Sequence, residues 1–472
     1  MNTTDLCFLS AAKMVSAVKR KKISPVEIMD AVLARIEKIN PKLNAYCTVV
    51  PEKARQAAKK AEKAVTKNEK LGPLHGVPVS VKDLTPTAGI RTTWGSKIFE
   101  DFVPQEDALV VQRLKAAGAI VVGKTNTPEF GAGANTYNQV FGTTWNPWKP
   151  GYTCGGSSGG AAVALACGLG PLATGSDLGG SLRIPASFCG VVGFRTSAGM
   201  VPIYPSYLGW DTLAVEGPMA RTVGDTALML SVIAGQDDRS PISFPIEPRE
   251  LLEAVQAPEI KGLRVAWSPD LGISPVDEEV RKIVASAARR FSELGCRVEQ
   301  AAPDFTGVQQ IIHVTRAARM VALHGEKLEK WRHQMNPNLV WNIEQGVPLT
   351  AKEIGEAEKD RTALYHRVRE FFVPYDLLLT PTVAVPPFPQ EMIYPKEING
   401  QPMKNYQEWL YLTYAITLTG LPAISIPCGF TPEGLPVGLQ IVGRRLAETT
   451  VLKAAAAYEA AEPWKDKRPP GG

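Results

Sequence analysis

Two glycine-rich serine motifs constrain this chain more than any other feature. The first reads Cys154-Gly-Gly-Ser-Ser-Gly-Gly160, and the second reads Gly175-Ser-Asp-Leu-Gly-Gly-Ser-Leu-Arg-Ile-Pro185. Glycine permits positive φ and close backbone approach, so Ser157 and Ser181 can stand on tight turns with bare N–H groups beside them. A covalent hydrolase needs such a hydroxyl, together with amide donors for the oxyanion that forms when the hydroxyl attacks a carbonyl.

A single lysine stands at the end of a short apolar run. The segment Val79-Ser-Val-Lys-Asp83 reads as a buried strand that ends at Lys82. Alternation along a strand places Lys82 opposite Val79 and Val81, where solvent is the ordinary destination of a lysine. If the fold buries Lys82 beside hydroxyl groups instead, the loss of hydration lowers the pKa of its ammonium and leaves a neutral amine that can act as a base.

A histidine base fits the sequence less well. Of the five histidines, His75 lies in a turn before the lysine strand and the other four lie in the helical middle of the chain. Gly155-Gly-Ser-Ser-Gly159 satisfies the Gly-x-Ser-x-Gly formula of a nucleophile elbow. The residues before it contain Pro and Gly and do not read as the strand that such an elbow must terminate. Lysine is therefore the better candidate.

In order and spacing, the two serine motifs and the lysine strand resemble the amidase signature family of serine hydrolases. The match is dense over about residues 74–202 and resumes at Leu421–Gly429 and Gly434–Gly443, which look like the closing strands of that family. The resemblance implies a single domain over residues 1–472. It implies an α/β fold in which a large, mixed, twisted β-sheet is flanked on both faces by α-helices. The more variable region of about 237–389 is expected to shape the substrate pocket.

The resemblance also implies roles for the site residues. Ser181 would be the nucleophile that carries the acyl group, and Lys82 would be the base. Ser157, whose peptide bond is cis in this family, would relay the proton between them and later protonate the leaving amine. The oxyanion hole would be formed by the backbone N–H groups of Leu178, Gly179, Gly180 and Ser181.

Other residues near the motifs are interpreted as support or as pocket walls. Asp177 and Arg183 are expected to hold the glycine turns by charge-assisted hydrogen bonds, and Ser158 is assigned to the same structural support. Cys154 reads as a buried structural residue, and Asp83 either is structural or tunes Lys82. The aromatic residues that could line a substrate pocket are Phe130, Tyr137 and Trp145.

The segment Gly118–Thr125 fits the formula of a phosphate-binding loop. Its four inner residues are an apolar β run where the phosphate cradle should be, and Pro128 interrupts any following helix. We therefore interpret this segment as a strand.

Apolar runs bounded by helices indicate a mixed sheet that is buried on both faces. Strands are expected over Val77–Val81, Ala119–Val122, Pro171–Thr174, Leu263–Trp267 and Leu377–Leu379. Helices are expected from Pro25 to near Asn40, and over about 52–68, Asp107–Ala117, Ser158–Cys167, Val276–Leu294 and Thr350–Phe372. Ser24 with Glu27 predicts a capping box, and Thr350 is a second helix cap with Glu353 at the third position.

Composition argues against several classes of protein. The net charge of +5 is small and no long basic tract is present, which argues against nucleic-acid binding. No apolar run approaches the roughly 18 residues needed to span a bilayer. The seven cysteines are scattered, and no His/Cys/Asp cluster has the spacing of metal ligands. We expect a cytoplasmic monomer or homodimer that needs no cofactor or metal and acts on a small-molecule amide without nucleic-acid or membrane partners.

Two activities remain open at this point. The first is a standalone amidase that hydrolyses small, hydrophobic or aryl amides to acid and amine, with esters and carbamates as further substrates. The second is the glutaminase-type component of a tRNA-dependent amidotransferase, known as its A subunit, which shares the motif set. The region His324-Gly-Glu-Lys327 to Trp341 looks more like the independent amidases, because it lacks the Arg-Arg segment expected of the amidotransferase component. The first activity is therefore favoured.

Overall fold

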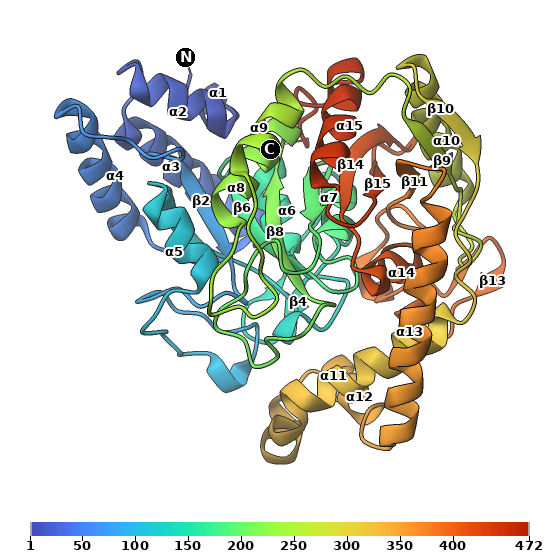
Figure 1. Cartoon of the computed structure of the whole chain (residues 1–472). Coiled ribbons are helices and arrows are strands. Elements are labelled where there is room, and N and C mark those ends of the chain that lie inside the picture. The colour runs from blue at the N-terminus through green and yellow to red at the C-terminus, as the bar shows by residue number, and fades with distance from the viewer. Residues whose placement is uncertain (1, 471–472) are drawn as a thin grey trace.

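A long twisted sheet organises the chain in this computed structural model, which describes residues 2–470 (Figure 1). Within those residues the sheet has 11 strands. In spatial order they are β1 (Tyr46–Val49), β3 (Ile120–Thr125), β2 (Pro78–Lys82), β6 (Leu172–Asp177), β8 (Val215–Ala220), β7 (Val192–Arg195), β14 (Ala423–Phe430), β15 (Pro436–Gly443), β11 (Leu377–Pro381), β9 (Arg264–Trp267) and β10 (Arg297–Gln300). Two small hairpins stand apart from it, β4–β5 (Tyr137–Asn138 and Gly142–Thr143) and β12–β13 (Glu397–Ile398 and Gln401–Pro402).

The sheet is mixed, as the sequence predicts. Strand β2 runs parallel to both of its neighbours, β3 and β6, and β9 runs parallel to β10 and β11. The pairs in the middle of the sheet, from β6–β8 through β14–β15, are antiparallel. Because β2 and β6 are parallel neighbours, Lys82 at the end of β2 and Asp177 at the end of β6 arrive at the same edge of the sheet.

Helices cover both faces of the sheet. Strand β15 shows this directly, because residues of opposite parity point to opposite faces. A Cβ atom on Gly438 would lie 2.7 Å from Ser187 of α7, whereas one on Gly443 would lie 2.5 Å from Val451 of α15. The helices are α1 (Thr3–Cys7), α2 (Ala11–Lys19), α3 (Pro25–Leu43), α4 (Pro51–Thr66), α5 (Leu109–Ala116), α6 (Gly159–Ala166), α7 (Arg183–Cys189), α8 (Val223–Ile233), α9 (Pro248–Gln256), α10 (Glu278–Glu293), α11 (Val308–Trp331), α12 (Pro337–Glu344), α13 (Ala351–Phe371), α14 (Tyr411–Thr419) and α15 (Glu448–Ala461). Short 3-10 turns occur at Lys97–Phe99, Glu129–Gly131, Arg332–Gln334, Gln390–Met392 and Glu408–Leu410.

The predicted elements agree with the observed ones to within a few residues. Both helix starts carry full capping boxes, Ser24 with Glu27 and Thr350 with Glu353. The helix expected to end near Asn40 continues through Pro41 to Leu43, and it ends at Asn44 in the left-handed conformation. For α11 the sequence indicates only a helical region without bounds, and for α14 it predicts no helix; both helices supply walls of the site described below.

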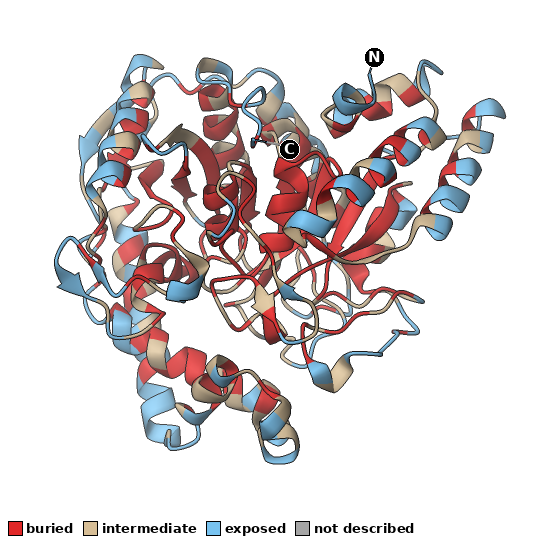
Figure 2. Ribbon diagram, turned by 180° about the vertical axis from the view of Figure 1, so that it is seen from behind, coloured by how far each residue is buried: buried red, intermediate tan, exposed pale blue. Residues whose placement is uncertain are grey.

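Burial is concentrated in the sheet and the helices packed directly on it (Figure 2). Every residue of β2, β3 and β15 is buried. Helices α11, α12 and α13 form an arm at one end of the molecule, with exposed residues along their outer sides (Figures 1 and 2). Of the helices between residues 2 and 470, none combines the length and the apolar character that crossing a membrane requires.

Candidate active site

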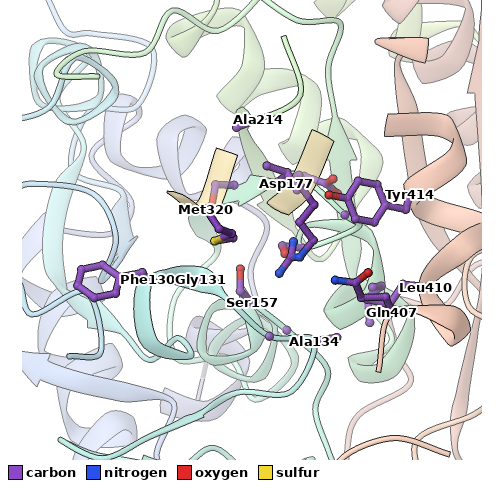
Figure 3. Close-up of a pocket in the computed structure, with 18 of the residues that line it drawn as sticks. Phe130, Gly131, Ala134, Ser157, Asp177, Ala214, Met320, Gln407, Leu410 and Tyr414 are labelled. Carbon is purple, nitrogen blue, oxygen red and sulfur yellow. The ribbon is translucent and has the colours of Figure 1, made fainter. Parts of the chain in front are cut away.

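A cavity of about 130 Å³ lies where the two serine motifs meet the ends of β2 and β6. Ser157 and Ser181 both line it, together with the backbone turn Leu178–Gly179. The far walls come from α11, α14 and the segment before α14 (Figure 3). The full set of lining residues includes Leu84, Phe130, Gly131, Ala134, Ile184, Arg316, Arg319, Met320, Tyr406, Gln407, Leu410 and Tyr414.

Lys82 is fully buried, contrary to what strand alternation alone suggests for a lysine. Its Nζ lies 2.8 Å from Ser157 Oγ, 2.9 Å from Ser158 Oγ and 3.0 Å from Ser176 Oγ. Burial lowers the pKa of Lys82 to about 7, although the carboxylates of Asp177 and Glu216 favour its charged form. Lys82 can therefore lose its proton near neutral pH, and the single lone pair of the neutral amine can then accept a proton from one of these hydroxyl groups.

Ser157 sits between the lysine and the cavity. The Gly156–Ser157 peptide bond is cis, and Ser157 precedes α6, whose first residue is Gly159. No strand ends at this serine, which agrees with the sequence argument against a nucleophile elbow. Ser157 connects the lysine to the cavity wall (Figure 3), and Ser176, which also contacts Lys82, lines the same cavity.

Ser181 lies in the turn between β6 and α7, and it is partly accessible from the cavity. The turn needs glycine, because Gly180 has φ +117° and an added Cβ atom would lie 2.4 Å from Thr413 Oγ1. Within residues 2–470, the backbone N–H groups of Leu178, Gly179 and Ser181 have no hydrogen-bond acceptor. Three free amides beside a hydroxyl are the arrangement that stabilises an oxyanion.

The predicted oxyanion hole requires one correction. The N–H of Gly180 donates to Asp177 Oδ1 at 3.0 Å, so this amide is already occupied. The candidate donors are therefore reduced from four to three, namely Leu178, Gly179 and Ser181.

Asp177 holds this turn through a dense set of contacts. Arg183 donates to both carboxylate oxygens, from Nη2 to Oδ1 at 2.9 Å and from Nε to Oδ2 at 3.0 Å. Arg195 Nη1 donates to the Asp177 carbonyl at 2.7 Å, and the Leu182 N–H donates to Oδ2 at 3.1 Å. Burial would raise the pKa of Asp177, but the guanidinium groups of Arg183 and Arg195 hold it well below its usual range. Asp177 and Arg183 therefore lie where the sequence analysis placed its structural supports.

The position of Ser158 goes beyond structural support. Its hydroxyl contacts Lys82 Nζ directly, as does that of Ser176, to which the sequence analysis gave no role. Ser176 immediately precedes Asp177 in the second motif, at the end of a strand parallel to β2. That adjacency is the signal that could have identified it.

The three aromatic residues predicted to line the substrate pocket do not lie together. Phe130 lines the cavity, and Tyr137 lines a small neighbouring cavity of about 20 Å³, where its hydroxyl accepts from Asn338. Trp145 lines neither cavity. Its backbone bridges to Thr153 and donates to the Leu43 carbonyl, so it belongs to the packing of this loop.

The residues do not support a histidine base, a Cys154 nucleophile or a phosphate-binding loop at this cavity. None of the five histidines lines the cavity, and burial raises the pKa of the Cys154 thiol to about 12. Gly118–Thr125 contains β3, in which the buried Lys124 donates to the Thr85 carbonyl and pairs with Asp83 at 3.8 Å. Asp83 is thus the partner of Lys124 and not of Lys82.

Comparison with known proteins places the whole chain in one group. A family model described as Amidase matches residues 27–452. An acylamidase of Rhodococcus erythropolis is 39% identical, with 99% of this chain and 98% of the relative covered. The A subunit of the glutamyl-tRNA(Gln) amidotransferase of Carboxydothermus hydrogenoformans is 36% identical, with 98% and 99% covered. The crystal structure of a bacterial aryl acylamidase of the amidase signature enzymes superposes with a TM-score of 0.91 at 32% identity, covering 98% of this chain and 99% of that one.

The Asp177 network generates the first prediction. Asp177→Asn should lower the free energy of unfolding by about 3–5 kcal/mol, because it leaves two buried guanidinium groups without their counter-charge. Asp30→Asn is the matched control, since Asp30 and Arg55 form an exposed pair whose loss should cost about 1 kcal/mol or less. Denaturant unfolding of both variants measures the difference. Equal small losses would show that the network does not support the turn.

Proposed function

This chain belongs to the amidase family, and on that premise we propose that it acts alone as an amidase on small, hydrophobic or aryl amides, with the acyl group carried on Ser181. The observation that supports this most strongly is the contact of a buried lysine with a serine hydroxyl at the cavity wall, 2.8 Å between Lys82 Nζ and Ser157 Oγ. A neutral amine in that position can remove a proton through the hydroxyl without any other base.

The proposed reaction begins with attack of Ser181 Oγ on the amide carbonyl. The Ser181 proton passes to Ser157 Oγ as the Ser157 proton passes to the neutral amine of Lys82. The oxyanion is held by the N–H groups of Leu178, Gly179 and Ser181, each of which contributes on the order of 3 kcal/mol to transition-state stabilisation. When the C–N bond breaks, Ser157 gives a proton to the leaving nitrogen and recovers one from Lys82. Water then attacks the acyl-enzyme by the same proton path and releases the acid.

The cavity walls support the choice of substrate. Phe130, Leu84, Ile184, Met320 and Leu410 present apolar surface on several sides of the reacting hydroxyls. An alkyl or aryl group attached to the amide can be buried against these side chains. Esters and carbamates offer a similar carbonyl to the same nucleophile, and we include them in the proposed range.

The amidotransferase component remains the second candidate, because several relatives of that name are 34–36% identical over nearly the whole chain. The acylamidase is more similar, at 39%, and the aryl acylamidase structure superposes at a TM-score of 0.91. The structure of the corresponding glutamyl-tRNA(Gln) amidotransferase chain from Thermotoga maritima superposes less closely, at 0.75. These comparisons and the apolar cavity favour the standalone enzyme.

Variants of the three proposed catalytic residues test the mechanism. Ser181→Ala should abolish hydrolysis of an anilide, and Ser157→Ala or Lys82→Ala should each lower kcat by about 10³-fold or more. The double variants should lose little beyond the single ones, because the three groups act as one unit. Ser292→Ala, on the exposed side of α10, is the control and should keep the full rate. Release of aniline measures the rate, and thermal unfolding confirms the fold. Near-normal activity of Ser181→Ala would remove it as the nucleophile.

A pH profile tests the neutral lysine. Because the base form of Lys82 is the deprotonated one and its pKa is lowered to about 7, kcat/KM should rise with pH through about 7 and level off above it. Lys82→Arg should be inactive, because a guanidinium cannot act as a base near neutrality.

Glu216→Gln provides a second test of that profile. The Glu216 carboxylate favours the charged form of Lys82, so its removal should move the rising limb to lower pH. Two results together would exclude Lys82 from the proton path: a rising limb that does not move in Glu216→Gln, and a Lys82→Arg variant that retains activity.

A substrate comparison separates the two candidate functions. The purified chain should hydrolyse a hydrophobic anilide by itself and show little activity on glutamine, because several cavity walls are apolar and the acidic residue that lines the cavity, Asp177, is already paired and cannot bind the glutamine ammonium. Initial rates on anilides, primary amides, carbamates and glutamine at equal concentration give the ranking. Efficient cleavage of glutamine, with no activity on any hydrophobic amide, ester or carbamate, would replace the first candidate with the second.

A further inference from the structure

The wall of the cavity formed by α11 contains a buried guanidinium. Arg316 is only 7% exposed and lines the same cavity as Ser157 and Ser181. It comes from the helical arm, far in sequence from the motifs that supply the catalytic groups.

The protein partners of Arg316 are neutral. Its Nε donates to Asn342 Oδ1 at 2.8 Å, and its Nη2 donates to the Tyr406 hydroxyl at 2.8 Å. Among residues 2–470, no carboxylate forms an ion pair with Arg316, and the third side chain beside its guanidinium is Tyr414. Burial raises the pKa of the neighbouring Tyr414 phenol, so that group stays neutral at pH 7 and supplies no counter-charge.

The other arginines around the site differ in this respect. Arg183 and Arg195 share the carboxylate of Asp177, and Arg319 pairs with Asp211 at 2.7 Å. Asp177 is the one acidic residue among those that line the cavity, and its oxygens are already taken by arginine and backbone donors. The charge of Arg316 is thus uncompensated on the wall of a cavity that a substrate must enter.

A buried charge is costly unless a partner neutralises it, so an uncompensated guanidinium facing a binding cavity indicates a ligand of opposite charge. The planar fork of arginine matches a carboxylate better than any neutral acceptor. Tyr406, Gln407 and Tyr414 surround this wall with further hydrogen-bonding groups. Figure 3 shows Tyr414 and Gln407 on the side of the cavity opposite Phe130, with Ser157 between them.

We propose that Arg316 is a specificity-determining residue that binds a carboxylate on the substrate, so that the preferred substrates are amides bearing an anionic group as well as an apolar one. This inference rests on the proposed amidase function and narrows its substrate class. The apolar walls near Phe130 and Leu84 would hold the hydrocarbon part, and Arg316 would fix the charged end.

Two pairs of anilides test the proposal in the whole chain. Succinanilic acid against valeranilide places the carboxylate on the acyl side, and 4-acetamidobenzoate against 4-acetamidobenzamide places it on the amine side. We expect the carboxylate to raise kcat/KM by about tenfold or more in one of the pairs. In Arg316→Gln that preference should disappear. We expect kcat/KM to fall by about 10–100-fold for the anionic substrate and to change by less than about threefold for the neutral one.

Arg319→Gln is the matched control, since Arg319 lies one turn away on the same helix and lines the same cavity but has its own carboxylate partner. The preference for the anionic substrate should survive in this variant. No preference in the wild-type chain for either pair, or an equal loss on both members in Arg316→Gln, would overturn the proposal. Failure of the amidase function would look different, since no amide would then be hydrolysed in a manner that depends on Ser181.

A binding measurement keeps the proposal testable without turnover or a folded Arg316 variant. Calorimetry on the wild-type chain and on Ser181→Ala should show 4-phenylbutyrate binding at least about tenfold more tightly than 4-phenylbutanol. Equal affinity for the acid and the alcohol would overturn the assignment of Arg316.

Discussion

The carboxylate of Asp177 is the contact on which the arrangement of the site depends. This carboxylate accepts hydrogen bonds from the guanidinium groups of Arg183 and Arg195. It also accepts from the backbone N–H groups of Gly180 and Leu182, the residues on either side of Ser181. One carboxylate therefore pairs with two buried guanidinium groups and fixes the path of the backbone at Ser181. The same contacts remove Gly180 from the set of free amides, so the geometry that positions the proposed oxyanion hole also limits it to three donors.

The sequence predicted the fold class and, from local patterns that buried strands and capped helices leave, five of the eleven strands in the described part of the sheet; the family resemblance added β14 and β15. The capping boxes at Ser24 and Thr350 and the strands around Lys82 and Leu377 are local patterns of this kind. The motif residues Lys82 and Ser157 lie in contact, and Ser181 lines the same cavity, although their catalytic roles remain predictions. Arg316 and Tyr414 were missed because their importance depends on where α11 and α14 meet at the cavity, which no local pattern records, whereas Ser176 was missed although it lies within the second motif.

Lys82 of β2 and Lys124 of β3 are equally buried but differ in their partners, and this difference separates the proposed base from a structural ammonium. Lys82 and Lys124 are both completely buried, and burial lowers the pKa of both. Lys124 contacts a backbone carbonyl, threonine hydroxyls and the Asp83 carboxylate, which stabilise a fixed ammonium. The Lys82 side chain contacts serine hydroxyls, which can both donate and accept, and two of these serines, Ser157 and Ser176, line the cavity.

The arm formed by α11, α12 and α13 supplies walls of the cavity, whereas the groups proposed to break the amide bond come from the sheet and its adjoining turns. Because α11 contributes wall residues but none of the groups proposed to react, a substitution on this helix can change which compounds fit the cavity and leave Lys82, Ser157 and Ser181 in place.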